Sequence, residues 1–410
     1  MRIPAPALIC LILLTFAVDW YILRDIKQYI SRKWKKVFYG VYLATAIICW
    51  LVLAVIAFWP LRSPDHDTFV VMWLLFGYLS IYIPKAFYTI CSLLGRFFFR
   101  NHHANFGAMF GGTVAMLVFI VMWWGVFFTR HELDLQKVEI SSPRIPTAFN
   151  GYRIVQFSDV HVGTWGNDTL FVSSLVDSIN SLNPDLIVFT GDIVNRKTKE
   201  LNPFIDIFGR LRAKDGVYSI LGNHDYGDYV DWKSPSDREE NNRELSRLQK
   251  KIGWTLLNNK GAWIKRDNDS IALVGVENWG DPPFKCYGDL QAAVKNIPGK
   301  FGPYDDNYKI LLTHNPEHWN QVVTNESNFD LTLSGHTHAM QASVGEGGNR
   351  ISPAVFRYKY WGGLYNRTSA DSIPMNLYVN IGSGEVGIPV RIGSAVPEIT
   401  LFELKSVSAK

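Results

Sequence analysis

The sequence predicts an α/β domain that follows a region of four transmembrane helices. Long apolar stretches are confined to the first 130 of the 410 residues. Beyond them, short apolar runs that end in Gly, Asn or Asp alternate with helix-like segments, which is typical of an α/β layer fold. We therefore expect a transmembrane region over residues 1–130, a linker with a first strand over 131–150, and a folded domain over 151–405.

Four stretches in the first part are long enough to cross about 30 Å of hydrocarbon at about 1.5 Å per residue. These stretches are residues 3–23, 37–59, 69–89 and 106–129. The second and the fourth contain no charged residue. The first also resembles a secretory signal, but Asp19, Trp20 and Tyr21 stand where cleavage needs small residues. The sequence therefore predicts a multi-pass integral membrane protein in a lipid bilayer.

The distribution of charge predicts the orientation in the membrane. Residues 1–130 carry 12 Lys and Arg against 4 Asp, a net charge of +8, which leaves 29 basic and 33 acidic residues beyond them. Six basic residues lie between Arg24 and Lys36, whereas the next loop contains only Arg62. Because basic loops stay in the cytoplasm, four spans place both termini and the C-terminal domain outside it. Lys85, near the end of the third span, is expected to reach the membrane interface.

The C-terminal domain carries the remaining net charge of −4. It therefore lacks the positive charge that attracts nucleic acid, and we expect no such partner.

The apolar runs of the C-terminal domain predict strands, and its amphipathic segments predict helices. The predicted strands cover residues 153–158, 186–190, 217–221, 271–276, 309–313, 331–334 and 377–381. The predicted helices cover residues 168–180, 203–212 and 237–250.

Five of these strands are each followed at once by a short polar motif. The motifs are Asp159-Val160-His161, Gly191-Asp192, Gly222-Asn223-His224-Asp225, Thr313-His314 and Gly335-His336-Thr337-His338. In open α/β sheets the loops at the carboxyl ends of strands meet at one crevice, so we expect these side chains to gather there. Carboxylate, imidazole and amide ligands suit divalent manganese, iron or zinc. Two such ions can clamp a phosphoryl group, and Asp192 is the natural candidate to bridge them.

In these motifs the sequence resembles the calcineurin-like metallophosphoesterase family, whose pattern runs D-x-H, GD, GNHD, H and GHTH. The resemblance covers residues 154–404, and segments 352–365 and 390–399 are similar to a membrane-associated bacterial branch. It implies a two-sheet α/β sandwich flanked by helices, with the catalytic domain over 151–405. Where many members have Asp in GD-x-x-D-R, this chain has Asn195, which bears on the phosphate contacts rather than the metals.

The resemblance also implies a role for each motif residue. It assigns one divalent ion to Asp159, His161 and His338, a second to Asn223, His314 and His336, and the bridge to Asp192. His224 is similar to the family's catalytic histidine, which is no ligand, and Asp225 is expected to orient its ring. Arg196 is expected to be a solvent-exposed residue rather than a substrate contact, and His318 an ordinary surface or helix histidine. An aromatic cluster is interpreted either as packing or as a pocket wall; it comprises Phe356, Tyr358, Tyr360, Trp361 and Tyr365.

The leading hypothesis is a membrane-anchored phosphoesterase that hydrolyses a phosphomonoester or phosphodiester. A hydroxide held between two metal ions would attack phosphorus in line while His224 assists departure of the alcohol. The substrate could be lipid-linked or derived from the cell envelope. A pyrophosphatase acting on a nucleotide-lipid such as UDP-diacylglucosamine is the alternative, and it requires a cytoplasmic domain. A non-catalytic scaffold is disfavoured, because no expected ligand is lost.

Overall fold

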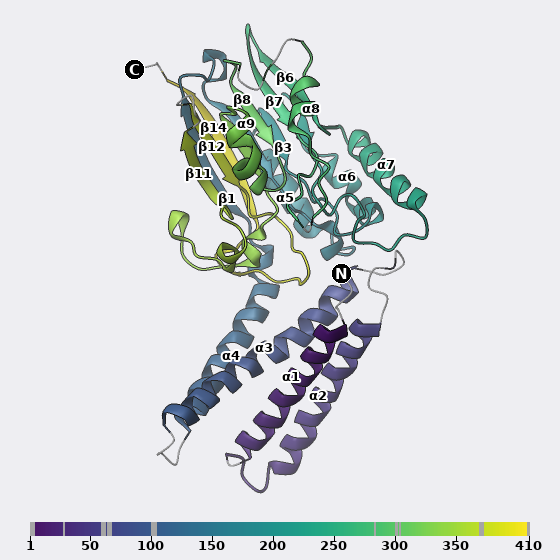
Figure 1. Cartoon of the computed structure of the whole chain (residues 1–410), viewed down its shortest axis with the longest axis vertical. Coiled ribbons are helices and arrows are strands. Elements are labelled where there is room, and N and C mark those ends of the chain that lie inside the picture. Colours follow the sequence, from purple (N-terminus) through teal and green to yellow (C-terminus); the bar gives the residue numbers. More distant parts are fainter. Residues whose placement is uncertain are drawn as a thin grey trace. The chain divides into compact units, whose positions relative to one another are not determined.

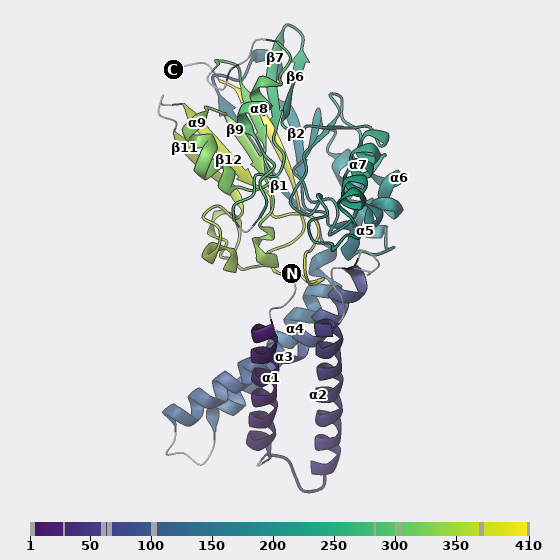
Figure 2. The same cartoon turned by 45° about the vertical axis from the view of Figure 1, so that its right-hand side comes forward.

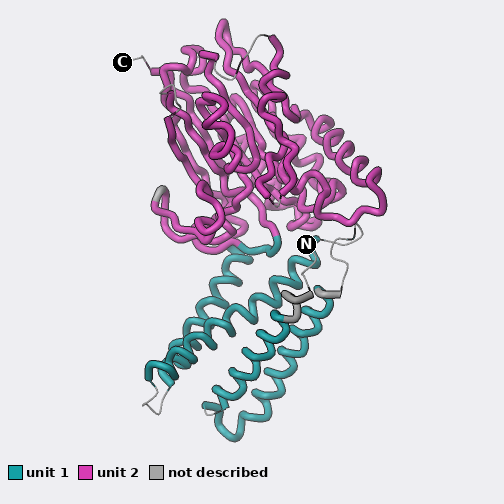
Figure 3. The backbone as a smooth tube through the Cα atoms, in the orientation of Figure 1, with its two compact units in different colours: residues 1–128, 387–390 teal, residues 129–386, 391–410 magenta. Residues whose placement is uncertain are grey.

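The computed structural model describes the chain except for residues 1–4, 28, 59–62, 64–67, 100–104, 283, 300–301, 303–304, 369–372 and 408–410. The chain divides into two compact units (Figure 3). One comprises residues 1–128 with 387–390, and the other comprises residues 129–386 with 391–410. The first is called the helical unit below and the second the sheet unit.

The helical unit contains four long helices (Figure 1), which are α1 (Ala5–Ile26), α2 (Lys35–Phe58), α3 (Thr68–Phe98) and α4 (Phe106–Phe127). Within the described residues, α2, α3 and α4 are long and apolar enough to cross a membrane. The predicted start of the first helix at Ile3 and the predicted end of the second at Trp59 lie outside the described residues. The third helix runs well past its predicted end at Thr89, because Ser92 and Arg96 of its last turns bond to Asp25 of α1.

The position of Lys85 differs from the prediction. Lys85 lies inside α3, which continues to Phe98, and its ammonium group pairs with the buried Asp19 of α1 at 2.8 Å. The hydroxyls of Tyr42 and Tyr82 donate to the same carboxylate at 2.6 and 2.7 Å. An ionisable group within a helix bundle is stabilised by such partners, so the pair joins α1, α2 and α3 through polar contacts.

The sheet unit is built from two six-stranded sheets with helices on their outer faces (Figures 1 and 2), as predicted. The first has the order β1-β14-β2-β3-β4-β5, with β1 (Asp134–Ser142), β14 (Glu398–Ser406), β2 (Tyr152–Phe157), β3 (Leu186–Phe189), β4 (Val217–Ser219) and β5 (Trp254–Leu256). The second has the order β11-β12-β9-β8-β7-β6, with β11 (Gly363–Thr368), β12 (Pro374–Val379), β9 (Leu331–Ser334), β8 (Lys309–Leu312), β7 (Asp269–Gly275) and β6 (Lys260–Arg266). A two-stranded pair joins β10 (Ala342–Ser343) to β13 (Ile392–Gly393).

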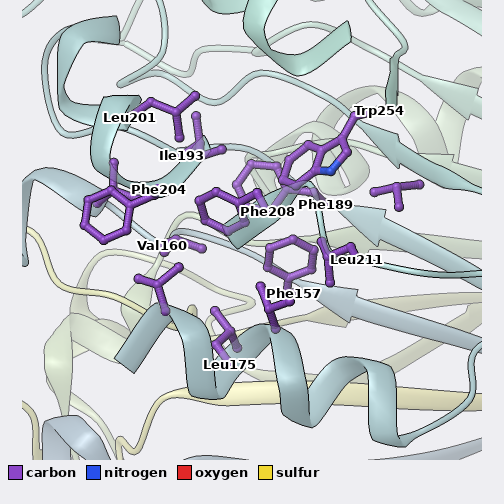
Figure 4. Packing of buried hydrophobic residues seen from close by; sticks show 14 of the residues in the cluster. Phe157, Val160, Leu175, Phe189, Ile193, Leu201, Phe204, Phe208, Leu211 and Trp254 are labelled. Carbon is purple, nitrogen blue, oxygen red and sulfur yellow. The ribbon is translucent and has the colours of Figure 1, made fainter. Parts of the chain in front are cut away.

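Successive side chains along a strand point to opposite faces of its sheet, so the two sheets create three apolar layers. One lies between the sheets and one on each outer face. In β3, Leu186 and Val188 point into the core between the sheets, whereas Ile187 and Phe189 point to the outer face. All four are fully buried, as expected for a parallel strand covered on both sides. On the outer face Phe189 packs with Trp254 and with residues of α5 (Leu170–Ser181) (Figure 4). Two further helices, α6 (Ile205–Phe208) and α7 (Pro235–Lys251), complete this layer.

The opposite outer face is covered by α8 (Leu290–Lys295) and by a turn of π-helix over Trp319–Val323 that leads into α9 (Thr324–Glu326). The helix predicted over residues 203–212 is mostly absent. A 3₁₀ segment over Thr198–Phe204 leads into the single turn of α6, which ends at Phe208 before Gly209, a poor helix former. Parallel pairing aligns β2 with β3 and β4, and β8 with β9, so the five motif loops leave the same edge of the two sheets.

Candidate metal centre

The seven predicted ligands lie together at the carboxyl ends of the strands. Six of them form two buried groups, and within each group one ligand-type atom of every residue lies within 4.8 Å of the others. The first group is Asp159, His161 and His338, and the second is Asp192, His314 and His336. The seventh residue, Asn223, joins the second group, since its Oδ1 lies 3.2 Å from Nε2 of His314.

Asp192 stands between the two groups. Its Oδ2 lies 3.5 Å from Nε2 of His161 in the first group and 3.2 Å from Nε2 of His314 in the second. Its other oxygen accepts a hydrogen bond from the backbone N–H of His224 at 2.8 Å. One carboxylate oxygen therefore lies within reach of ligands from both groups.

The ring nitrogens of the four histidines converge on one another. Nε2 of His161 lies 3.1 Å from Nε2 of His338, and Nδ1 of His336 lies 3.2 Å from Nε2 of His314. Nδ1 of His314 donates to the carbonyl of Thr190 at 2.8 Å, which directs its Nε2 to the centre. Lone pairs that face one another and a carboxylate repel unless a proton or a cation lies among them. This donor set therefore fits divalent metal ions.

Except at His314, the electrostatics favour the protonation states that bind metals. Burial raises the pKa of Asp159, but the neighbouring His338 outweighs it and lowers this pKa to about 2. Burial lowers the pKa of His161 far below its usual range and that of His336 to about 3. His314 differs, because the adjacent Asp192 overcomes the effect of burial and raises its pKa to about 9. Ionised carboxylates and neutral imidazoles are the forms that coordinate metals.

The backbone is strained at this site. Five of the predicted ligands adopt positive φ angles, which side chains other than glycine rarely adopt; they are Asp159, His161, Asp192, His336 and His338. Each such residue costs about 1–3 kcal/mol and persists only where its surroundings enforce it. Gly335 is required by the tight packing, because a Cβ atom there would lie 2.2 Å from Oδ2 of Asp159.

The surroundings of His224 differ from the expectation. Its ring is held through Nδ1 by the backbone carbonyl of Asn195 at 2.6 Å, and not by Asp225. The carboxylate of Asp225 accepts four backbone N–H groups, from Asp192, Ile193, Val194 and Gly222, at 2.8 to 3.2 Å. Asp225 therefore shapes the two loops that carry Asp192 and His224. Unlike the residues of the two buried groups, His224 is only partly buried.

Two tyrosines that the motifs did not predict also line the site. The hydroxyl of Tyr229 accepts a hydrogen bond from the Asn223 amide at 2.7 Å, and its ring lies 4.4 Å from that of His224. The hydroxyl of Tyr358 lies 3.3 Å from Nε2 of His336. Tyr358 belongs to the aromatic cluster, which the sequence allowed to be interpreted either as packing or as the wall of a pocket. At Tyr358 the structure favours the pocket wall.

The other members of the cluster serve different purposes. Tyr360 is buried against Trp319 and Tyr365, so it is a packing residue. Phe356 is 93% exposed. Arg196 is partly buried rather than fully exposed, and His318 is completely buried beside Trp279 at the start of the π-helical turn.

A loop that contains Ser383 and Gly384 holds the Asp159 motif through backbone hydrogen bonds. The backbone N–H groups of Ser383 and Gly384 donate to the carbonyls of Ser158 and Asp159 at 2.9 and 2.8 Å. A Cβ atom at position 384 would lie 1.8 Å from the Val160 carbonyl oxygen, so only glycine fits. The next residue, Glu385, is fully buried and pairs with Arg130 at 3.2 Å.

Comparison with known proteins identifies two segments of the chain. Residues 152–340 match the family model described as calcineurin-like phosphoesterase. Residues 2–130 match the model described as probable calcineurin-like phosphoesterase, transmembrane domain. The transmembrane match covers the part with the long apolar stretches, and the phosphoesterase match covers the part with the five polar motifs.

Three relatives illustrate the range of similar proteins. The metallophosphoesterase YkuE of Bacillus subtilis is 30% identical over 287 residues, which is 69% of this chain and 89% of that protein. A transmembrane protein with metallophosphoesterase domain from Danio rerio is 28% identical over 357 residues, or 80% and 72% of the two chains. The UDP-2,3-diacylglucosamine pyrophosphatase LpxG of Chlamydia muridarum is 27% identical over 57% of this chain and 79% of its own.

Two six-stranded sheets with paired Asp and His groups at their strand ends define the class of the protein, which is a metal-dependent phosphoesterase with a membrane domain. The chain belongs to the calcineurin-like phosphoesterase family. The resemblance that the five motifs predicted is thereby confirmed.

Proposed function

We propose that the protein hydrolyses a phosphomonoester or phosphodiester at a site that binds two divalent ions. The observation that carries this proposal is the position of Asp192, whose Oδ2 lies within 3.5 Å of a histidine from each buried group. The first ion would be held by Asp159, His161 and His338, and the second by Asn223, His314 and His336. Manganese, iron and zinc all suit these ligands.

Two bound ions would supply Lewis acidity and an activated water to the phosphoryl group. The chain itself supplies orientation and proton transfer. The Asn195 carbonyl holds the His224 ring at its Nδ1, so Nε2 is the atom available to a leaving oxygen. His224 is a neighbour of His161, with ring centroids 4.8 Å apart, but it belongs to neither ligand group. We infer that it protonates the departing alcohol.

The ligand assignment is tested by Asp192→Asn, which keeps the size of the side chain and removes its charge. Without this carboxylate the two ions would repel each other across the site, so metal content and activity should fall together. Asp177→Asn on the exposed face of α5 is the matched control and should change neither. If elemental analysis found two ions per chain in Asp192→Asn and its turnover were normal, the bridging role would be refuted.

We further propose that the catalytic domain, residues 151–405 with the linker 131–150, lies outside the cytoplasm after four membrane spans. The support is the excess of basic residues between Arg24 and Lys36. A phosphatase reporter that works only outside the cytoplasm, fused after Lys410, should be active. Activity of a cytoplasmic reporter at the same position would reverse the orientation and favour the alternative that acts on UDP-diacylglucosamine.

We propose that the substrate is carried by a lipid. In the sheet unit, five of the exposed large apolar side chains fall within the short segment 340–356; they are Met340, Val344, Ile351, Val355 and Phe356. This segment, called the apolar segment here, connects His338 of the first ligand group to Tyr358 beside the second. Exposed apolar side chains that cluster in a short segment indicate a surface that contacts another apolar surface. For a protein with a membrane domain, lipid is the apolar partner that we propose.

The full-length protein in vesicles tests this substrate class. Phe356→Ser should reduce hydrolysis of a long-chain phosphatidic acid but not of its water-soluble dibutyryl counterpart or of nitrophenyl phosphate. Leu170→Ser is the matched control, because Leu170 is 78% exposed on α5, away from the apolar segment in sequence. Equal losses on soluble and lipid substrates, or equal effects of the two variants, would count against a lipid-borne substrate. Turnover of UDP-diacylglucosamine in the same vesicles would identify the pyrophosphatase alternative.

A further inference from the structure

The helical unit contains a pocket of about 600 Å³ where α1 and α3 end and α2 begins. It is lined by Tyr21, Arg24, Asp25, Lys27, Lys35 and Arg96. Its volume lies within the range of about 300–1,000 Å³ that is usual for small-molecule sites. All of its lining residues belong to the helical unit, so it is a different site from the candidate metal centre.

The charge of this basic pocket is strongly unbalanced. Four cationic side chains face one carboxylate, which leaves an excess of three positive charges. The carboxylate of Asp25 accepts hydrogen bonds from the guanidinium N–H groups of Arg96. Among the described residues, Arg24, Lys27 and Lys35 form no ion pair, and Lys35 is partly buried. Cations gathered without counter-charges in a pocket indicate an anionic ligand.

The buried carboxylate of Asp25 fixes the position of one cation in the pocket. It is 1% exposed and accepts hydrogen bonds from the hydroxyls of Tyr88 and Ser92, each at 2.7 Å. With the carboxylate fixed in this way, the guanidinium of Arg96 is held at the pocket while half of its side chain stays exposed. A guanidinium with free N–H groups is suited to bind phosphate oxygens in pairs.

The position of the pocket along the transmembrane helices indicates the source of the anion. The adjoining turn between α1 and α2 exposes the aromatic side chains of Tyr29 and Trp34, which typically sit at the level of lipid headgroups. The same turn carries the basic residues that predict a cytoplasmic location, and anionic lipids are concentrated in the cytoplasmic leaflet. Basic pockets between transmembrane helices at this level bind anionic headgroups.

We propose that the basic pocket binds the phosphate of an anionic phospholipid headgroup. The phosphate would lie between Arg96, held by Asp25, and the two cations Arg24 and Lys35, which form no ion pair among the described residues. Binding would fix the ends of α1, α2 and α3 to one another through the lipid. The shared chemistry is a phosphate anion, so the experiment must separate a lipid headgroup from free phosphate.

The test uses the full-length protein in phosphatidylcholine nanodiscs with increasing phosphatidylglycerol, and bound lipid is measured by native mass spectrometry. The double variant Arg24→Gln, Lys35→Gln removes two cations that line the pocket. The matched control is Arg32→Gln, Lys36→Gln, which removes two exposed cations from the same turn and helix start that do not line it. We expect the first double variant to bind phosphatidylglycerol about 30-fold more weakly, and the control to bind it within about threefold of the original chain.

Equal weakening in both double variants would overturn the proposal, because it would mean unspecific attraction to the basic turn. Competition with inorganic phosphate and with glycerol 1-phosphate separates the two sources of the anion. If either soluble anion displaces phosphatidylglycerol at equal concentration, the assignment to a lipid is wrong. Gel filtration and helical circular dichroism check folding. Should the double variant misfold, the single variants Arg24→Gln and Lys35→Gln are compared with Arg32→Gln and Lys36→Gln by the same criteria.

Discussion

His224 occupies the position of a proton donor rather than that of a ligand. Its Nδ1 is bonded to the Asn195 carbonyl, so loss of the ring should leave both ligand groups intact. General acid catalysis is worth about 10² to 10⁴ in rate, so His224→Ala should reduce turnover by that factor while metal content is unchanged. The loss should shrink for nitrophenyl esters, whose leaving group scarcely needs a proton. Loss of metal, or equal losses on good and poor leaving groups, would refute the assignment.

His318 predicts a dependence of stability on pH. Burial lowers its pKa from 6.5 to about 3, so between these values the unfolded chain binds a proton that the folded chain excludes. The free energy of unfolding should therefore fall as the pH falls from 6.5 towards 3, by up to about 1.4 kcal/mol per pH unit.

His318→Gln removes the titrating group and should flatten this dependence relative to the original chain. The exposed His131→Gln is the control and should leave the slope unchanged. Melting temperatures of the full-length protein at pH 7 and pH 5 provide the measurement. If the pH-dependent difference between wild type and His318→Gln were zero, burial of a neutral His318 would not be the cause.

At the residue scale, the motifs were sufficient to predict which side chains gather, because each motif follows a parallel strand and the ends of such strands share one edge. The supporting groups could not be predicted in this way. The bond to His224 comes from a backbone carbonyl, which every residue carries, and Tyr358 arrives on a loop with no fixed spacing from the motifs. The Lys85 to Asp19 pair joins two helices whose packing the apolar pattern does not specify.

At the scale of elements, one buried arginine holds the loop behind Asp159. Arg391 donates to the carbonyls of Gly384, Ala395, Ile381 and Gly382, which fixes the turn whose N–H groups reach Ser158 and Asp159. Arg391→Met leaves these buried acceptors unsatisfied, so the sheet unit should lose about 2–4 kcal/mol of unfolding free energy and bind metal more weakly.

The matched control is Arg367→Met on the exposed edge strand β11, which should leave both stability and metal affinity near their original values. Arg391→Lys should not restore them, since one ammonium group cannot reach carbonyls on both sides of the turn. Denaturant unfolding and metal titration measure the two effects. Unchanged metal affinity in a destabilised Arg391→Met protein would limit Arg391 to a structural role.

The seven predicted strands all occur within a few residues of their expected bounds, and β9 matches throughout. Their apolar runs are buried on both faces, which gives a strong local signal. β14 was not predicted as a strand, although it lies between β1 and β2. Its partners are remote in sequence, since Glu398 pairs with Asp134, and it carries charges such as Glu398, which is buried and accepts hydrogen bonds from Tyr378 and Thr400 at Oε1.

At the scale of the whole molecule, the chain combines two compact units with a separate candidate site in each. A ligand that binds only the folded state stabilises it by about 4 kcal/mol at 1,000 times its dissociation constant. The stabilisation is local where the ligand contacts one unit. Metal and anionic lipid should therefore protect different peptides from hydrogen exchange.

Hydrogen-exchange mass spectrometry of the full-length protein in nanodiscs can separate the two effects. Removal of metal with a chelator should speed exchange in segments 158–162, 191–195 and 334–341, where strained backbone depends on bound ions to offset its cost. Exchange in segments 24–36 and 92–99 should not respond to the chelator, but it should slow when phosphatidylglycerol replaces part of the phosphatidylcholine. The Arg24→Gln, Lys35→Gln protein should lose the lipid response and keep the metal response, whereas Asp192→Asn should do the opposite. A lipid response confined to the sheet unit would contradict the headgroup site, and a chelator response confined to the helical unit would contradict the metal assignment.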